Sequence, residues 1–194
     1  MIFNCYSARK FFGVSDGAYL ISNKISSDNI PLLPESTSSE NSLYLMKTIE
    51  QGTNNIYQDH LANEKRLEKS YTKMSPLTQR ILSSIDYQKV QSLRYKNLLR
   101  LHENLKDINL FQVNLSTKTQ YYYPLLVVQE DFREKLVSNH IYTPTWWRHV
   151  PEQSNYAKIE TLLSKYMVFL PIDQRYTISD MDDISEIAMK CRKI

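Results

Sequence analysis

Ser7 and Lys10 are the two residues near the start of this 194-residue chain whose types and spacing could do chemistry together. A lysine amine is a nucleophile only in its neutral form, which requires burial or a neighbouring cation to lower its pKa. Lys10 follows a short apolar run, adjoins Arg9 and precedes Phe11-Phe12. Ser7 lies three residues earlier, so that in a turn its hydroxyl can hold an oxyanion beside the amine. The ordinary alternative is a solvated lysine that follows a strand.

The Ser-x-x-Lys spacing has a second interpretation, in which the serine is the nucleophile of a penicillin-binding enzyme and the lysine assists it. Ser27-Asp28-Asn29 matches the second motif of that enzyme class. The third motif, Lys-Thr-Gly, does not occur in the chain, and the Ser-Asp-Asn falls in a segment with the composition of a loop. The residues therefore favour lysine chemistry over serine chemistry.

Glycine usage points to the same window. The chain has 3 glycines, whereas average usage predicts roughly 13 or 14. Two of the three, Gly13 and Gly17, follow Lys10 closely. We expect unusual backbone geometry in this window, because glycine adopts such geometry without steric cost.

The elements that position this window are expected from apolar periodicity. The segment 2–22 predicts a strand, a lysine-bearing turn and a second strand over Ala18-Tyr19-Leu20-Ile21. A long loop rich in Ser, Asn and Pro is expected over 22–41. Apolar residues at helical spacing then predict one kinked helix or two over 42–70, with a break at Gly52-Thr53-Asn54-Asn55.

The second half of the chain changes from helices to a mixed pattern. Ser75-Pro76 and Asp86 are signals for the start of two helices that fill about 76–105. Beyond them the pattern predicts alternating elements: strands over 110–115, 121–128 and 166–172, and helices over 131–136, 154–163 and from a cap at Ser179 to about Cys191. This alternation predicts a small α/β lobe and excludes a helical bundle or a pure β-barrel.

Composition excludes several classes of function. The net charge of +3 is small and spread along the chain, so we expect no nucleic acid as partner. The longest apolar run is far too short for a bilayer span, and no secretory signal is recognisable. Cys5 and Cys191 lie at opposite ends of the chain, which excludes a disulfide scaffold and a cysteine-rich zinc site. We expect a cytoplasmic protein without a metal site, since the four histidines are also widely separated: His60, His102, His140 and His149.

Two further groups are weaker candidates for a binding role. Trp146-Trp147 could face a substrate or a sugar ring, although core packing with one ring at the surface is the more common arrangement. Asp173 and Arg175 could pair or reach a partner, but a turn into the last helix is the favoured interpretation.

The lysine window resembles a known family of enzymes. Residues 6–20, YSARKFFGVSDGAYL, resemble the lysine segment of DegT-type aminotransferases, which are pyridoxal-phosphate enzymes of fold type I that often act on nucleotide-linked sugars. The resemblance covers nearly the whole chain and continues in the family's order through 74–75, 85–87, 94–98 and 170–176. One departure is Ser15, which stands where a proline is common and is expected to loosen the turn slightly.

The resemblance implies a fold, a cofactor and site residues. The fold would be α/β, the C-terminal part of a fold type I transferase: residues 1–85 would be the remnant of the large cofactor-binding domain, and residues 86–194 the small domain with a mainly antiparallel sheet. The cofactor would be pyridoxal 5'-phosphate. Lys10 would be the Schiff-base lysine and the catalytic residue, and Ser7 would bind the cofactor phosphate.

The resemblance also implies that part of the enzyme is missing. In the family the residues before the lysine supply most of the cofactor site, whereas Met1 to Arg9 are all that precede Lys10 here. We therefore expect the C-terminal portion of an aminotransferase for a small-molecule substrate, inactive alone, with a second copy in a homodimer or a missing N-terminal half as partner. One alternative is a non-catalytic remnant or interaction module. Another is a basic module that uses Arg94, Lys96 and Arg100.

Overall fold

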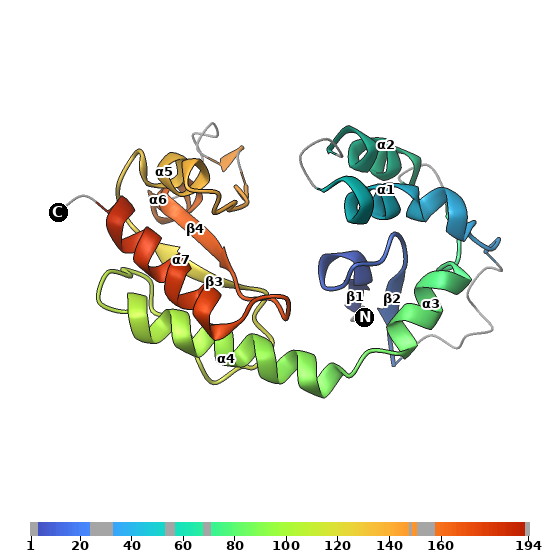
Figure 1. Cartoon of the computed structure of the whole chain (residues 1–194), viewed down its shortest axis with the longest axis horizontal. Coiled ribbons are helices and arrows are strands. Elements are labelled where there is room, and N and C mark those ends of the chain that lie inside the picture. The colour runs from blue at the N-terminus through green and yellow to red at the C-terminus, as the bar shows by residue number, and fades with distance from the viewer. Residues whose placement is uncertain are drawn as a thin grey trace. The chain divides into compact units, whose positions relative to one another are not determined.

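The structure is a computed structural model that describes residues 4–23, 33–52, 57–67, 71–147, 149–150 and 158–192. It divides into two compact units, Met1–Ile85 and Asp86–Ile194, which occupy the blue-to-green and green-to-red parts of the ribbon in Figure 1. The Ser27-Asp28-Asn29 motif and the expected helix start at Ser154 lie outside the described residues.

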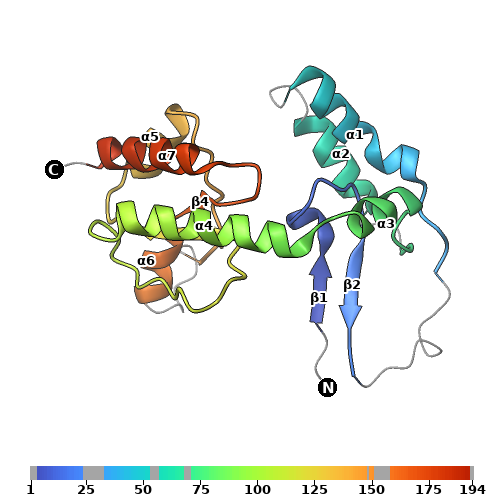
Figure 2. The same cartoon turned by 60° about the horizontal axis from the view of Figure 1, so that its bottom comes forward.

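The first unit contains the expected strand, lysine turn and second strand. Strand β1 (Asn4–Ser7) pairs antiparallel with β2 (Ala18–Ile21), with Asn4 opposite Ile21 and Ser7 opposite Ala18. Figure 2 shows the two strands side by side. A single turn of 3-10 helix, η1 (Ala8–Lys10), follows β1 directly. All four residues of β2 are exposed.

Three helices complete the first unit: α1 (Ser38–Gln51), α2 (Tyr57–Leu67) and α3 (Pro76–Ser83). The region 42–70 therefore forms two helices, and α1 ends at Gly52, whose φ of 77° suits glycine. Helix α1 begins inside the segment that was expected to be a loop, with Thr37 at its N-cap. At α3 the expected cap is confirmed, because the Ser75 side chain accepts a hydrogen bond from the Thr78 N–H.

Helix α1 packs mainly through polar groups. Its apolar residues Leu43, Met46 and Ile49 are 55%, 55% and 86% exposed, whereas Asn41 and Ser42 are buried. Ion pairs join α1 to α2: Lys47 Nζ lies 2.9 Å from Asp59, and Arg66 lies 3.2 Å from Glu40. The periodicity of α1 thus indicates a helix but not the face that the first unit buries.

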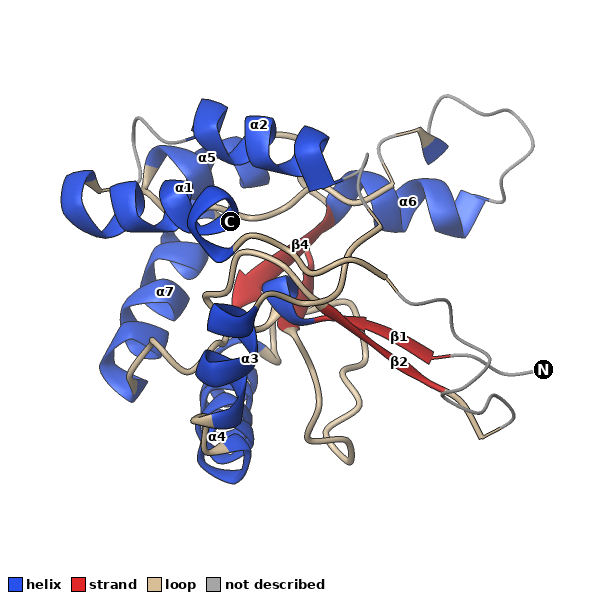
Figure 3. Cartoon of the chain, turned by 90° about the vertical axis from the view of Figure 1, so that its right-hand side faces the viewer, coloured by secondary structure: helices blue, strands red, loops and turns tan. Residues whose placement is uncertain are grey.

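The described residues of the second unit form an antiparallel sheet of two strands with helices around it; Figure 3 draws the strands in red and the helices in blue. Strand β3 (Tyr122–Leu126) pairs with β4 (Met167–Pro171). The helices are α4 (Tyr87–Leu105), α5 (Phe132–Ser138), α6 (Lys158–Tyr166) and α7 (Ile178–Cys191). The mixed α/β class and the small antiparallel sheet are confirmed for this unit.

One face of this sheet forms the core with α4 and α7. Alternate strand residues point to the same face, so Tyr123, Leu125, Val168 and Leu170 are buried together. The facing side chains come from the two long helices: Leu98, Leu101 and Leu105 of α4, and Met181, Ile184 and Ala188 of α7. All these residues are buried, so burial of apolar area is the main force that joins the layers.

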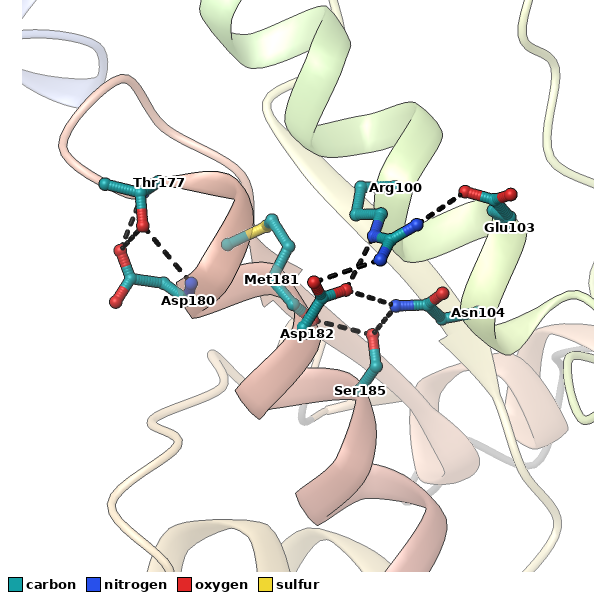
Figure 4. A network of polar contacts seen from close by, with 8 residues as sticks. All are labelled: Arg100, Glu103, Asn104, Thr177, Asp180, Met181, Asp182 and Ser185. Atoms are coloured by element: carbon teal, nitrogen blue, oxygen red, sulfur yellow. Dashed lines mark hydrogen bonds and ion pairs between the residues drawn. The ribbon is translucent and has the colours of Figure 1, made fainter.

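Polar side chains also join α4 to α7 beside this core (Figure 4). Arg100 donates from Nε and Nη2 to the two carboxylate oxygens of Asp182, at 2.6 and 3.0 Å. Asn104 donates to Asp182 at 2.9 Å and to Ser185 Oγ at 3.2 Å. These bonds fix the rotation of α7 against α4.

The strand expected over 110–115 is absent, although all of these residues are described. Asn109 takes its place at the open edge of β3. Its amide donates to Pro124 O at 2.8 Å, and its carbonyl accepts from Leu126 N at 2.9 Å. The Asn109 side chain thus bonds to backbone groups of β3 that a third strand would otherwise pair with. The next residue, Leu110, makes one backbone hydrogen bond to this edge, from its N–H to Leu126 O.

The cap of the last helix was assigned to the wrong residue. The N-cap of α7 is Thr177, not Ser179: Thr177 and Asp180 form a reciprocal capping box, shown in Figure 4. The expected cap of α4 is confirmed, since Asp86 accepts from Lys89 N at 2.9 Å.

No helix in the described part of the chain combines the length and the apolar character that crossing a bilayer requires.

Candidate functional site

Ser7 and Lys10 lie at the two ends of the η1 turn. Ser7 is its N-cap residue, with extended φ and ψ of −78° and 112°, and Lys10 is its last residue. Ser7 is half-buried and Lys10 is exposed. The hydroxyl and the amine are thus brought to the start and the end of one short turn that follows β1.

Backbone hydrogen bonds define the conformation of the turn. Ala8 N donates to Gly17 O at 3.2 Å, which closes the loop directly after the last strand pair. Phe11 N and Phe12 N both donate to Ala8 O, at 3.0 and 3.1 Å. The lysine thus lies within a hydrogen-bonded turn and not on a free loop.

A small apolar cluster packs against the turn. Ala8 and Val14 are 5% and 2% exposed and pack with Leu82 of α3, with Phe12 and Met74 at the edge of the cluster. Buried residues therefore precede and follow the lysine at Ala8 and Val14, while the lysine itself is exposed.

Asp16 is the polar anchor of the turn. It is 3% exposed, and its Oδ1 accepts from Ser75 N at 3.0 Å while its Oδ2 accepts from Asn41 Nδ2 at 2.9 Å. Burial alone would raise the pKa of this carboxyl, but the hydrogen bonds from Ser75 and Asn41 outweigh burial, and the pKa is lowered. Asp16 therefore ties the turn to the start of α3 and to the first turn of α1.

Ser15 strengthens this anchor. Its hydroxyl is buried and lies 3.1 Å from the hydroxyl of Ser42 in α1. Because the resembling family often has a proline at this position, the sequence predicted a slightly looser turn. The structure instead has a serine that adds a hydrogen bond which proline lacks.

Of the two glycines in the window, Gly17 alone has the unusual backbone that was expected. Its φ is 92°, and a Cβ built on it would lie 2.6 Å from Met74 Cγ. Gly13 has no such constraint: its φ lies outside the left-handed range, and a Cβ there would meet nothing within 4 Å. The expectation for Gly13 was therefore wrong.

The surroundings expected to desolvate Lys10 are not supplied by the described residues. Lys10 is exposed. The neighbouring guanidinium of Arg9 forms an ion pair with Glu64 of α2, which offsets its charge. A water-excluding wall over Lys10 would have to come from other parts of the protein or from a partner.

The donor groups of the turn fit two ends of pyridoxal phosphate. An exposed primary amine suits the aldehyde, and a serine hydroxyl three residues earlier suits the phosphate. The group that would pair with the pyridine nitrogen is a carboxylate, and the carboxylate of this turn, Asp16, is buried with both oxygens already accepting hydrogen bonds. The turn thus fits the reactive end and one phosphate contact of the cofactor.

The remaining sequence candidates have structural roles. Trp146 stacks on Phe169 of β4 with ring centroids 4.1 Å apart, and Trp147 is 59% exposed. Arg175 donates to both carboxylate oxygens of Asp173, at 2.8 and 2.9 Å, in the turn before α7. Both arrangements match the favoured structural interpretations.

The basic and histidine candidates form no site within the described residues. Arg94 is buried and donates to Gln174 at 2.9 Å, and Arg100 is paired with Asp182, so the proposed basic face of α4 is largely taken up by internal contacts. Within the described ranges, His, Cys, Asp and Glu form no group of three that could hold a metal ion.

Sequence reasoning missed Asp16 and Asn109 as organising residues. For Asp16 a signal existed, because a carboxylate in a glycine-flanked turn followed by an apolar strand is a candidate for a buried acceptor. Its donors, Asn41 and Ser75, are distant in sequence, so the spacing alone could not identify them.

Comparisons with known proteins add little to this geometry. No protein-family model matches the chain, and no curated protein matches it. Among solved structures, it is similar to a DegT/DnrJ/EryC1/StrS aminotransferase from Brucella abortus, with a TM-score of 0.47 and 13% sequence identity. The match covers 72% of this chain and 44% of that chain, so this chain spans less than half the length of that aminotransferase.

Proposed function

We propose that this chain is the C-terminal portion of a pyridoxal-phosphate-dependent aminotransferase for a nucleotide-linked sugar or a related small molecule, with Lys10 as the lysine that holds the cofactor. The observation that carries the proposal is the η1 turn, which has Ser7 at one end and Lys10 at the other and is closed by the Ala8–Gly17 hydrogen bond. The resemblance of residues 6–20 to the family's lysine segment supports the same assignment.

Each residue of the turn has a defined task in this proposal. Lys10 Nζ would hold the cofactor at its aldehyde carbon, with loss of water, and the free amine would carry a proton to or from the substrate carbon. Ser7 Oγ would donate to a phosphate oxygen and so help to hold the phosphate. When bound, pyridoxal phosphate supplies an electron sink for the substrate carbon that bears the amino group.

We further propose that the chain needs a partner for turnover. The electron sink works only while the ring nitrogen is kept protonated by a carboxylate, and both oxygens of Asp16 are engaged in holding the turn. A second copy in a homodimer or a separate N-terminal half would supply that carboxylate. The cytoplasm is the proposed location, because it keeps thiols such as the free Cys5 and Cys191 reduced.

The test of Lys10 is reductive labelling with pyridoxal phosphate and borohydride, followed by peptide mapping. Lys96, an exposed lysine on α4, is the internal control. Because a hydrogen bond to a charged group contributes about 1.5–3 kcal/mol, Lys10 should be labelled at least about tenfold faster than Lys96. Lys10→Ala should lose this fast label, whereas equal rates at Lys10 and Lys96 would refute the assignment.

The test of the partner requirement uses the same protein with an amino donor. Conversion of pyridoxal phosphate to its pyridoxamine form should proceed no faster with the chain than with free lysine. Turnover well above that level would contradict the need for a separate N-terminal half and would leave a second copy of the chain as the partner.

A non-catalytic interaction module is the second candidate. It is favoured by the exposed apolar residues of α1 and β2, among them Ile49 at 86% and Ile21 at 57% exposure. Slow labelling of Lys10 together with concentration-dependent association in light scattering would favour this candidate over the enzyme.

A further inference from the structure

We propose that Asp16 is a positioning residue for Lys10, a role that rests on the proposed function of Lys10. In this role the carboxylate does not touch substrate or cofactor. It holds the turn so that the Lys10 amine and the Ser7 hydroxyl act together on one ligand.

The anchor is buried at every point of contact. Asp16, Asn41 and Ser75 are 3%, 4% and 0% exposed. The two donors come from different helices, Asn41 from the first turn of α1 and Ser75 from the N-cap of α3. Since water cannot compete for these bonds, loss of the acceptor leaves the Ser75 N–H without its acceptor and removes one of the two bonds of the Asn41 amide, which also donates to Ser36. The turn then loses its bond to α3 and its carboxylate bond to α1.

The anchor reaches the lysine through the hairpin backbone. Asp16 is followed by Gly17, whose carbonyl accepts from Ala8 N, and Ala8 is the first residue of the turn that ends at Lys10. Gly17 is itself held against Met74 with a positive φ. A shift of residue 16 therefore moves Ala8, and with it the spacing of Ser7 and Lys10.

The anchor requires an acceptor on both sides. An ionised carboxylate accepts at both oxygens, which matches the Ser75 N–H and the Asn41 amide. The lowered pKa keeps it ionised near neutral pH. In the Asp16→Asn variant an NH2 donor replaces the carboxylate oxygen that accepts from Asn41, so two donors face each other. The double exchange D16N/N41D restores a donor–acceptor pair at this contact.

The experiment compares two probes at Lys10. Pyridoxal phosphate and pyridoxal share the aldehyde, but only the former offers a phosphate to Ser7. In the full chain, Lys10 should react about tenfold faster with pyridoxal phosphate than with pyridoxal, by the same hydrogen-bond estimate as above. Asp16→Asn should lower this preference several-fold, and D16N/N41D should restore most of it. The rate at Lys96 should be the same in all three proteins.

The outcomes separate the two proposals. Absence of any phosphate preference at Lys10 in the unaltered chain would overturn the proposed function, and this inference with it. A preference that Asp16→Asn leaves unchanged would overturn the positioning role alone. If Asp16→Asn fails to fold, by circular dichroism, the exchange variant decides: a folded D16N/N41D protein without the preference would contradict the inference, and one with it would support it.

Discussion

At the scale of single residues, Asp16 and Gly17 hold the lysine turn by different physical means. Asp16 accepts hydrogen bonds from two buried groups, the Ser75 N–H and the Asn41 amide. Gly17 adopts a backbone conformation that other residues rarely adopt, with a φ of 92°. Because it has no side chain, it also leaves room for Met74. Neither residue carries the proposed chemistry, yet both determine where Lys10 lies.

We expect Gly17→Ala to destabilise the first unit by about 1–3 kcal/mol, because the new Cβ adds left-handed strain and displaces the Met74 side chain. Gly13→Ala is the matched control: it meets nothing within 4 Å, so its effect should lie between zero and a stabilisation of about 1 kcal/mol. Urea unfolding monitored by circular dichroism measures both. Equal free energies of unfolding for the two variants would contradict the assigned role of Gly17.

At the scale of elements, the start of α7 depends on a reciprocal pair of side chains. Asp180 accepts from the backbone and the hydroxyl of Thr177, both at 2.7 Å, and Asp180 N donates to the Thr177 hydroxyl. Helix α7 supplies Met181, Ile184 and Ala188 to the core. The position of its first turn therefore also determines where these side chains lie in the core of the second unit.

We expect Thr177→Ala to lower the free energy of unfolding by about 0.5–2 kcal/mol, as for other N-cap losses. Ser179→Ala, at an exposed position within the helix, should change it by less than about 0.5 kcal/mol. Thermal unfolding of the two variants, followed at the far-ultraviolet helix signal, makes the comparison. A lower melting temperature for Ser179→Ala than for Thr177→Ala would return the cap to Ser179.

The same cap predicts a pH dependence. The backbone N–H of Thr177, followed by its hydroxyl, lowers the pKa of Asp180 in the folded protein. A carboxyl whose folded pKa is depressed contributes stability that is complete above its unfolded pKa, about 3.9, and is lost as the pH falls through the folded value. Asp180→Asn should therefore reduce the slope of stability against pH below about pH 4. An unchanged slope in acid titrations of the melting temperature would count against this cap.

At the scale of the whole molecule, the two units have separate cores. The buried cluster of the second unit runs from Leu98 to Cys191 and draws no residue from the first. The cluster of the first unit consists of Ala8, Val14 and Leu82 with a few partly buried neighbours. Such a small core supplies little free energy, so the first unit depends more on its polar anchors.

We expect residues 86–194 to fold when expressed alone, with a cooperative thermal transition and dispersed NMR amide signals. The reason is that the core residues, the capping box and the Arg100–Asp182 pair all lie within this segment. Residues 1–85 alone should unfold with a weaker transition. A segment 86–194 that lacks cooperative unfolding would show that its core needs the first unit.

The sequence by itself determined the local elements of this protein. The hairpin near the N-terminus, the Ser75-Pro76 cap, the Asp86 cap and the apolar strands after α4 follow from short-range chemistry, and the corresponding elements are present. The lysine-bearing turn belongs to this class, because it lies between two short strands that pair with each other.

Only the tertiary structure decided which groups these elements meet. Asp16 is paired with donors from Asn41 and Ser75, and Asn109 replaces a strand at the edge of β3, because hydrogen bonds between residues distant in sequence satisfy buried groups. The apolar face of α1 is exposed for a related reason: periodicity specifies a helix, but the packing surface depends on what the rest of the unit presents to it.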